Sequence, residues 1–200
     1  MGQFFDEVIA FGVSLEECYD AMKRYSSELW SEVDEAMGPL WESEDEREEA
    51  KTLFCPNSLV VGRPKTFDGA VVLEVDSDAE VTAESISKTL RCPTIAIRVH
   101  TQNWCKLVAF DRGDWLGWIF WLSPSAFVTE GEVIPSVVTA ARVNGGWIGD
   151  PEIFEAFLMD NSSTSLVDIL DAHWDGPSEV VSAVKTAFGV GDKARISLPR

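Results

Sequence analysis

The chain has 200 residues, of which 46% are hydrophobic, and its 34 acidic and 16 basic residues give a formal net charge of −18. The apolar content argues against a disordered chain, and the charge argues against direct binding of nucleic acid or of an anionic membrane. Eight Trp and eleven Phe supply enough apolar area for a core that needs neither disulfides nor metal. We therefore expect a folded, acidic protein.

The first third of the chain predicts one strand followed by one long helix. Residues 4–11 mix aromatic and aliphatic side chains in the manner of a strand. Ser14 and Glu17 have the spacing of a capping box, in which the two residues satisfy each other's backbone amides at a helix start. Apolar residues then recur at mostly helical spacing, and Gly38 and Pro39 end the helix.

The most unusual segment is the acidic run that follows this helix. Residues 1–60 contain 15 acidic and 4 basic residues, whereas the remaining 140 contain 19 and 12. The run predicts a short helix over 42–51 that has no apolar stripe of its own. Its carboxylates belong to Glu42, Glu44, Asp45, Glu46, Glu48 and Glu49. Such a run either solubilises the chain or docks it on a basic partner, and mimicry of nucleic-acid phosphates is a variant of the second role.

The next segment is irregular before it becomes strongly patterned. Gly and Pro interrupt the chain after the acidic run, and only 59–61 predicts a strand there. Residues 70–76 are apolar on both faces, which is typical of a central strand. Thr82 predicts the N-cap of a helix that reaches about Arg91, since Pro93 disfavours helical backbone before it.

Three further strands complete the middle of the chain. They are predicted at 94–99, 104–110 and 115–122, and the connections between them have hairpin length and turn chemistry. Residues 70–122 therefore predict a β-α-β-β-β centre whose last three strands are antiparallel. With the N-terminal strand-helix unit, this order predicts an α+β fold with a mixed, mostly antiparallel sheet.

The C-terminal part of the chain becomes helical. Residues 123–149 alternate weak strand and loop signals. Helix starts are predicted at 150–152, 164–165 and 177–179. We expect residues 1–149 to form the α+β body, and the helical region 150–200 to pack on it within a single domain.

The aromatic strand from Trp115 to Trp121 is the second unusual feature. Alternation along a strand places Trp115 and Trp121 on one face and Trp118 on the other. Gly117 between them predicts a bulge or the close approach of another segment. Either the strand is central and buried on both faces, or Trp115, Trp118 or Trp121 lines a ligand pocket or an interface.

Catalytic and metal-binding patterns are weak. His100 and Cys105, with Asp111, suggest a Cys–His nucleophile across a turn, but Cys105 equally suits a buried small hydrophobe. Three acids, Glu74, Asp76 and Asp78, lie on or just after one strand, and they suggest a binding site for a hard cation. No phosphate-binding loop, nucleophile elbow or Cys-x-x-Cys occurs. We therefore predict no catalytic residue, no metal and no cofactor.

These observations favour a non-catalytic, acidic protein-binding module that engages a basic partner surface, as an inhibitor or immunity-type protein does. The alternatives are a small-molecule-binding or enzymatic domain with a Trp-lined pocket, and a structural subunit of a larger assembly. No apolar run approaches the roughly 18 residues needed to span a bilayer, and residues 1–12 lack the basic start of a signal peptide. The four scattered cysteines predict reduced, buried thiols, so we expect a cytoplasmic protein that binds neither membrane nor nucleic acid.

Overall fold

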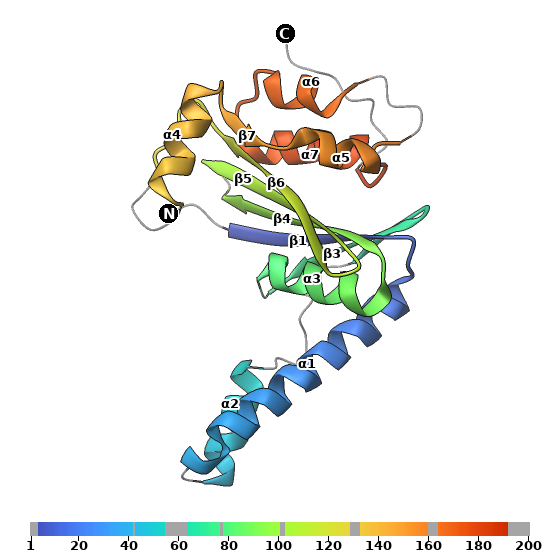
Figure 1. Ribbon diagram of the computed structural model, residues 1–200, viewed down its shortest axis with the longest axis vertical. Helices are drawn as coiled ribbons and strands as arrows, with labels where there is room; N and C mark the ends of the chain where they lie inside the picture. The colour runs from blue at the N-terminus through green and yellow to red at the C-terminus, as the bar shows by residue number, and fades with distance from the viewer. Residues whose placement is uncertain are drawn as a thin grey trace.

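Seven strands form one antiparallel sheet that carries helices on both faces (Figure 1). The computed structural model describes residues 4–41, 43–54, 64–76, 78–100, 103–128, 133–159 and 164–191. In their order across the sheet, the strands are β2 (Lys65–Phe67), β3 (Ala70–Val75), β1 (Phe4–Phe11), β4 (Pro93–His100), β5 (Trp104–Asp111), β6 (Asp114–Leu122) and β7 (Trp147–Gly149).

The position of β1 explains why neighbouring strands of the sheet are antiparallel. β1 lies between β3 and β4 and pairs antiparallel with both, so that Glu7 lies opposite Glu74 on one side and Ile97 on the other. β3 and β4 therefore run parallel without being neighbours, and helix α3 (Ala79–Leu90) connects them. The α+β fold and its β-α-β-β-β centre are confirmed. The described strands contain no parallel pair, because the N-terminal strand occupies the place between the two that run in the same direction.

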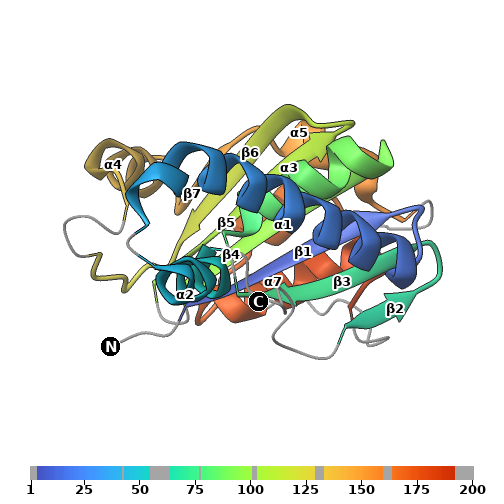
Figure 2. The same ribbon diagram turned by 90° about the horizontal axis from the view of Figure 1, so that it is seen from below.

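The helices form a layer on each side of the sheet. Besides α3, they are α1 (Leu15–Met37), α2 (Glu44–Phe54), α4 (Pro135–Val143), α5 (Pro151–Phe154), α6 (Leu166–Asp171) and α7 (Pro177–Ala187), with 3-10 turns η1 (Gly38–Leu40) and η2 (Glu155–Phe157). Figure 1 shows α5, α6 and α7 above the sheet and α1 and α3 below it. Figure 2 shows α1 and α3 lying across the lower face, with α4 at the end of the sheet that carries β7.

The larger apolar cluster lies between the sheet and the three C-terminal helices. Ile97 and Leu107 of the sheet are fully buried there, as are Phe154, Ile169 and Val184 of the helices. Large aliphatic and aromatic side chains of this kind contribute roughly 1.5–3 kcal/mol each on burial. The C-terminal helices thus share one core with the sheet.

The opposite face carries two smaller clusters. Under α1 and α3, the sheet residues Leu73 and Val108 pack with Met22 and Ile86. Under α4, a second cluster contains Trp104, Phe120, Leu122 and Ala141. Both clusters follow from strand alternation, which sends every second residue of β5 and β6 to this face.

Helix α1 has its buried residues only near its beginning. The predicted capping box is present, with Ser14 Oγ accepting from the Glu17 amide at 3.2 Å and Glu17 Oε2 accepting from the Ser14 amide at 2.7 Å. The buried residues of α1 all lie in its first turns, namely Cys18, Ala21 and Met22. The outer part of α1 therefore leaves the body, and α2 lies beside it (Figure 1). We call residues 25–54 the acidic arm.

Four sequence predictions need correction or lie outside the described residues. Residues 135–143 form helix α4 and residues 147–149 form strand β7, where we expected only weak strand and loop. Pro135 in the first turn is a signal for this helix, but Ile134 at its N-cap offers no side-chain acceptor to support it. Helix α3 is capped by Asp78, not by Thr82, because the Asp78 carboxylate accepts from two backbone amides. The predicted strand 59–61 lies outside the described residues.

Candidate functional site

The predicted acidic residues lie along α2, at the outer end of the acidic arm. Those that the structure describes are Glu44, Asp45, Glu46, Glu48 and Glu49, and all five are exposed. Glu42 lies outside the described residues. Neighbouring charges of one sign on a short helix repel each other by a few tenths of a kcal/mol per pair. The mutual repulsion of these carboxylates therefore weakens α2 itself.

Arg47 is the residue that fixes α2 on α1. Its Nε donates to Asp34 Oδ1 at 2.7 Å and its Nη2 donates to Asp34 Oδ2 at 2.5 Å, while Nη1 lies 3.1 Å from Glu44 Oε1. The hydrogen bond from Arg47 is the main reason that the pKa of Asp34 lies below its usual value. The fork geometry of guanidinium and carboxylate makes this pair more directional than a lysine pair would be.

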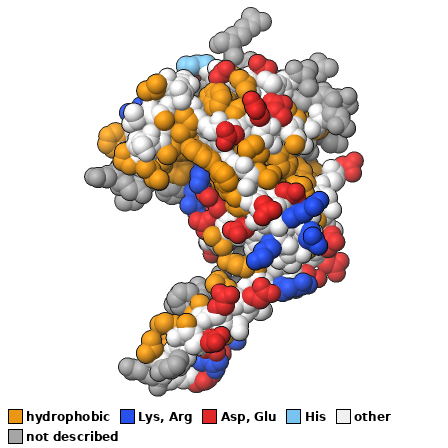
Figure 3. Space-filling view, viewed as in Figure 1, with side chains coloured by type: hydrophobic (Ala, Val, Ile, Leu, Met, Phe, Trp, Pro, Cys, Tyr) orange, Lys and Arg blue, Asp and Glu red, His pale blue; other side chains and the backbone are white. Residues whose placement is uncertain are grey.

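The acidic arm keeps a large excess of negative charge after these pairings. It contains ten acidic residues against two basic ones, Arg47 and Lys51. Lys51 lies 3.7 Å from Glu48, in an exposed pair of little energetic weight. Figure 3 shows hydrophobic side chains exposed on the arm together with the acidic ones. The arm therefore offers both charge and apolar area.

A hollow of about 460 Å³ lies at the root of the acidic arm, where α1 diverges from α3. Its apolar residues are Tyr25, Leu29 and Val81, and 46% of the Val81 surface is exposed. Its carboxylates are those of Glu28, Glu32 and Glu84, and its cations are those of Arg24 and Lys88. We call this hollow the α1–α3 groove.

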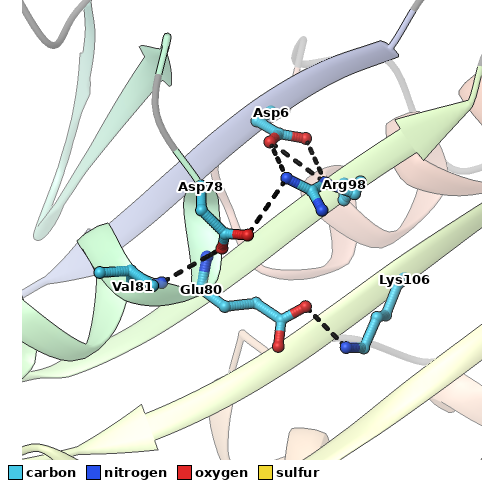
Figure 4. Close-up of polar contacts among 6 residues, drawn as sticks. All are labelled: Asp6, Asp78, Glu80, Val81, Arg98 and Lys106. Carbon is cyan, nitrogen blue, oxygen red and sulfur yellow. Dashed lines mark hydrogen bonds and ion pairs between the residues drawn. The ribbon is translucent and has the colours of Figure 1, made fainter. Parts of the chain in front are cut away.

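A row of charged side chains crosses the sheet between the clusters under α3 and α4. Asp6, Arg98 and Lys106 lie directly opposite one another on β1, β4 and β5. Arg98 Nε donates to Asp6 Oδ1 at 3.0 Å and its Nη2 donates to Asp6 Oδ2 at 2.7 Å (Figure 4). Hydrogen bonding to Asp6 is the main reason that the pKa of Arg98 is raised.

The charged row also attaches the start of α3 to the sheet. Arg98 Nη2 lies 3.4 Å from Asp78 Oδ2, and the other oxygen of Asp78 accepts from the Glu80 amide at 2.9 Å (Figure 4). Lys106 Nζ donates to Glu80 Oε1 at 2.6 Å. Because each ion has a partner of opposite charge, the geometry fits a structural role, namely orienting α3 and with it the root of the acidic arm.

Sequence analysis did not identify this row, although it contained a signal. Arg98 and Lys106 each place a charge within a largely apolar strand, and Asp6 stands beside Glu7 in the first strand. A single charge within a buried strand requires a partner, because an unpaired charge is costly to remove from water. Three such charges predict a cross-strand network, but only the register shows that they face one another.

The three tryptophans of the aromatic strand do not form a common pocket. Trp121 is buried in the cluster under the C-terminal helices, whereas Trp118 packs on the opposite face. A bulge between Ala109 and Phe110 shifts the pairing of β5 with β6, and Trp115 lies opposite Phe110. This shift moves Trp115 to the face of Trp118, contrary to simple alternation, and leaves it 57% exposed. No tryptophan lines the α1–α3 groove.

The pairing of the strands also bears on the catalytic and metal-binding hypotheses. His100 lies opposite Trp104, whereas Cys105 lies opposite Val99, so the imidazole and the thiol point to opposite faces of the sheet. Burial raises the pKa of Cys105, which disfavours the thiolate. Asp78 is engaged as the α3 cap and in the pair with Arg98, and within the described residues no three His, Cys, Asp or Glu side chains gather as a metal would require.

Among the described residues, no helix is both long and apolar enough to cross a membrane. The chain matches no protein-family model, no curated protein and no solved structure. Function is therefore inferred from the charges and contacts of the molecule itself.

Proposed function

We propose that this chain is a non-catalytic protein-binding module whose acidic arm docks on a basic surface of a partner protein. The observation that carries the proposal is the placement of α2, whose exposed carboxylates lie at the far end of a helix whose buried residues all lie in its first turns. A run of acids that served solubility alone would not need a 23-residue helix to extend it from the body. On the arm, a partner reaches the carboxylates without contacting the sheet.

The charge of the arm suits rapid and selective association. Its ten acidic and two basic residues produce a local negative field that attracts a basic surface from about one Debye length, roughly 8–10 Å at physiological salt. Such steering raises the association rate and disfavours acidic partners more than it adds affinity. The expected partner therefore carries a cluster of Lys and Arg.

The α1–α3 groove supports the proposal by supplying an apolar contact next to this charge. Leu29 and Val81 lie beside three carboxylates, those of Glu28, Glu32 and Glu84, which outnumber the two cations of the groove, Arg24 and Lys88. An apolar side chain flanked by basic residues would fit this arrangement. Interfaces commonly place most of their binding energy in a few such anchors and surround them with polar contacts.

The decisive experiment compares the removal of negative charge from the arm with the removal of the same amount of negative charge from the body. One variant neutralises the arm with Glu44→Gln, Asp45→Asn, Glu46→Gln, Glu48→Gln and Glu49→Gln. A matched control neutralises five exposed acids of the body with Glu74→Gln, Asp76→Asn, Asp114→Asn, Glu152→Gln and Asp175→Asn. Both variants change the net charge by the same amount, and Arg47 keeps Asp34 as its partner in each.

Capture of a partner from host lysate is compared between the two variants and the wild-type chain. We expect the arm variant to retain less than about a tenth of the captured partner, because several charge contacts are lost together, and the body variant to stay within about twofold. Equal losses in both variants would mean that only overall charge matters. Full capture by the arm variant, with helix content preserved by circular dichroism, would refute the proposal.

A cytoplasmic inhibitor or immunity-type protein is the kind of module that we propose. Cys18, Cys92 and Cys105 are buried and unpaired, as is usual in a reducing compartment. The partner would be a protein whose active or binding surface is basic, and docking of the arm would cover that surface.

A further inference from the structure

A small cavity lies on the other face of the sheet, between α7 and the strands β1 and β2. Its volume is about 150 Å³. Phe5 and Phe67 of the strands and Val181 of α7 supply apolar surface, and Ser178 and Ser182 of α7 supply hydroxyl groups, so the walls are mixed. Its charged residues are Glu7, Lys65 and Lys185. None of these residues belongs to the acidic arm or to the α1–α3 groove.

Glu7 and Lys185 form a fixed ion pair in the wall of this cavity. Lys185 Nζ donates to the two carboxylate oxygens of Glu7 at 2.9 and 2.7 Å. Only 12% of the Lys185 side chain and 15% of the Glu7 side chain are exposed. An ammonium group has three donors, so one N–H of Lys185 remains after this pairing. The pair therefore holds a cationic donor at a defined place in the wall.

Lys65 adds a second cation that is not neutralised within the described residues. It lies on the short edge strand β2, and no described carboxylate forms an ion pair with it. Glu74 lies opposite Glu7 on β3, but it is exposed and does not line the cavity. The lining thus carries two cations and one anion, in a chain whose net charge is −18. A local excess of positive charge in such a chain points to an anionic ligand.

We propose that this cavity binds a small monocarboxylate with a compact apolar body, of the size of benzoate. A cavity of about 150 Å³ is large enough for a benzene-sized molecule. The apolar body would lie against an apolar side chain of the lining, and the carboxylate would accept from Lys65 and from the remaining N–H of Lys185. An amine would instead face both ammonium groups, since the Glu7 carboxylate is already paired.

The negative charge of the chain makes the binding of a carboxylate a specific test of this proposal. A net charge of −18 repels small anions from most of the surface, so saturable binding of a carboxylate requires a local basic site. Benzoate is the probe, and benzamide is its neutral counterpart of nearly the same shape. Titration calorimetry on the full chain gives affinity and stoichiometry, and amide chemical-shift changes give the location.

We expect one molecule of benzoate to bind per chain with millimolar affinity, as is usual for so small a ligand. Amides of β1, β2 and α7 should shift, and benzamide should bind about tenfold more weakly because it lacks the charge-assisted hydrogen bonds. Absence of saturable binding up to about 20 mM benzoate would overturn the proposal. Equal binding of the two probes, or shifts confined to other parts of the chain, would also overturn it.

Three variants localise the site without disturbing the buried ion pair. Lys65→Met removes the exposed cation and should weaken benzoate binding about three- to tenfold. Ser182→Trp places a large ring over the cavity from an exposed position of α7 and should abolish binding. Lys23→Met, in which an exposed lysine of α1 is removed, is the matched control and should bind like the wild type. Unchanged binding in both cavity variants would show that benzoate binds elsewhere.

Discussion

Arg47 of α2 donates two parallel hydrogen bonds to Asp34 of α1, from Nε to Oδ1 at 2.7 Å and from Nη2 to Oδ2 at 2.5 Å. The pair joins the two helices of the acidic arm where few other contacts do. Its side chains are 37% and 24% exposed, so water screens it in part. It therefore fixes the direction of α2 more than it stabilises the whole fold.

Arg47→Met should loosen α2 from α1 and leave the body intact. We expect faster hydrogen exchange over 44–51, with a loss of overall stability below about 1 kcal/mol, because a half-exposed pair contributes little globally. Lys51→Met, which removes the other cation of the arm, is the control and should leave exchange unchanged. Unchanged exchange in the Arg47 variant would mean that apolar contacts alone hold α2.

Lys185→Met should destabilise the fold because it leaves the Glu7 carboxylate largely buried without its partner. We expect a loss of about 2–4 kcal/mol in the free energy of unfolding, measured in urea. Adding Glu7→Gln should restore at least half of this loss, because an amide is cheaper to bury than a charge. If the double variant is no more stable than the single one, the lost packing of the lysine stem is the cause instead.

Two glycine substitutions should change stability by different amounts. Gly149 has φ +123°, and a Cβ there would meet the Trp118 carbonyl of the neighbouring strand. Gly149→Ala should therefore cost about 2–4 kcal/mol and detach β7. Gly38 has helical backbone with φ −46° directly before Pro39, so a Cβ there would crowd the proline ring, and Gly38→Ala should cost no more than about 1 kcal/mol. Thermal unfolding of the two variants measures both effects.

Burial should make the structural thiols unreactive and stability pH-dependent above neutrality. Burial raises the pKa of Cys18 to about 12 and that of Cys92 to about 11, from an ordinary value of 9.0. The unfolded chain loses these protons first, so this contribution to stability is complete below pH 9.0 and is lost as pH rises towards those higher values. At pH 8, iodoacetamide should modify Cys18 and Cys92 only after unfolding, whereas rapid labelling of the folded chain would contradict their burial.

Much of the fold could be predicted because local rules determine it. The capping box at Ser14, the hairpin turns between β4, β5 and β6, and proline at the starts of α5 and α7 each fix a boundary by short-range chemistry. Helix α4 also begins with a proline, Pro135, and this signal was overlooked because no capping side chain accompanies it. The place of β1 between β3 and β4 depends on long-range pairing, which alternation along one strand does not reveal.

The candidate sites were predictable only in part. The exposed carboxylates of α2 follow from composition, but the extension of the acidic arm does not, because it depends on where α1 stops contacting the sheet. The ion pair of Glu7 with Lys185 joins residues 178 positions apart, so no sequence window contains both. The bulge at Ala109 reversed the expected side of Trp115, which shows how one extra residue changes a whole face.

The most direct test of the docking proposal is the salt dependence of partner capture by the wild-type chain. The immobilised chain is exposed to host lysate at low salt, washed at high salt, and the bound and released proteins are identified by mass spectrometry. We predict a basic protein that is retained at low salt and released at high salt, because exposed charges separated by water are screened. A partner that withstands the high-salt wash, or that is not basic, would contradict docking through the acidic arm.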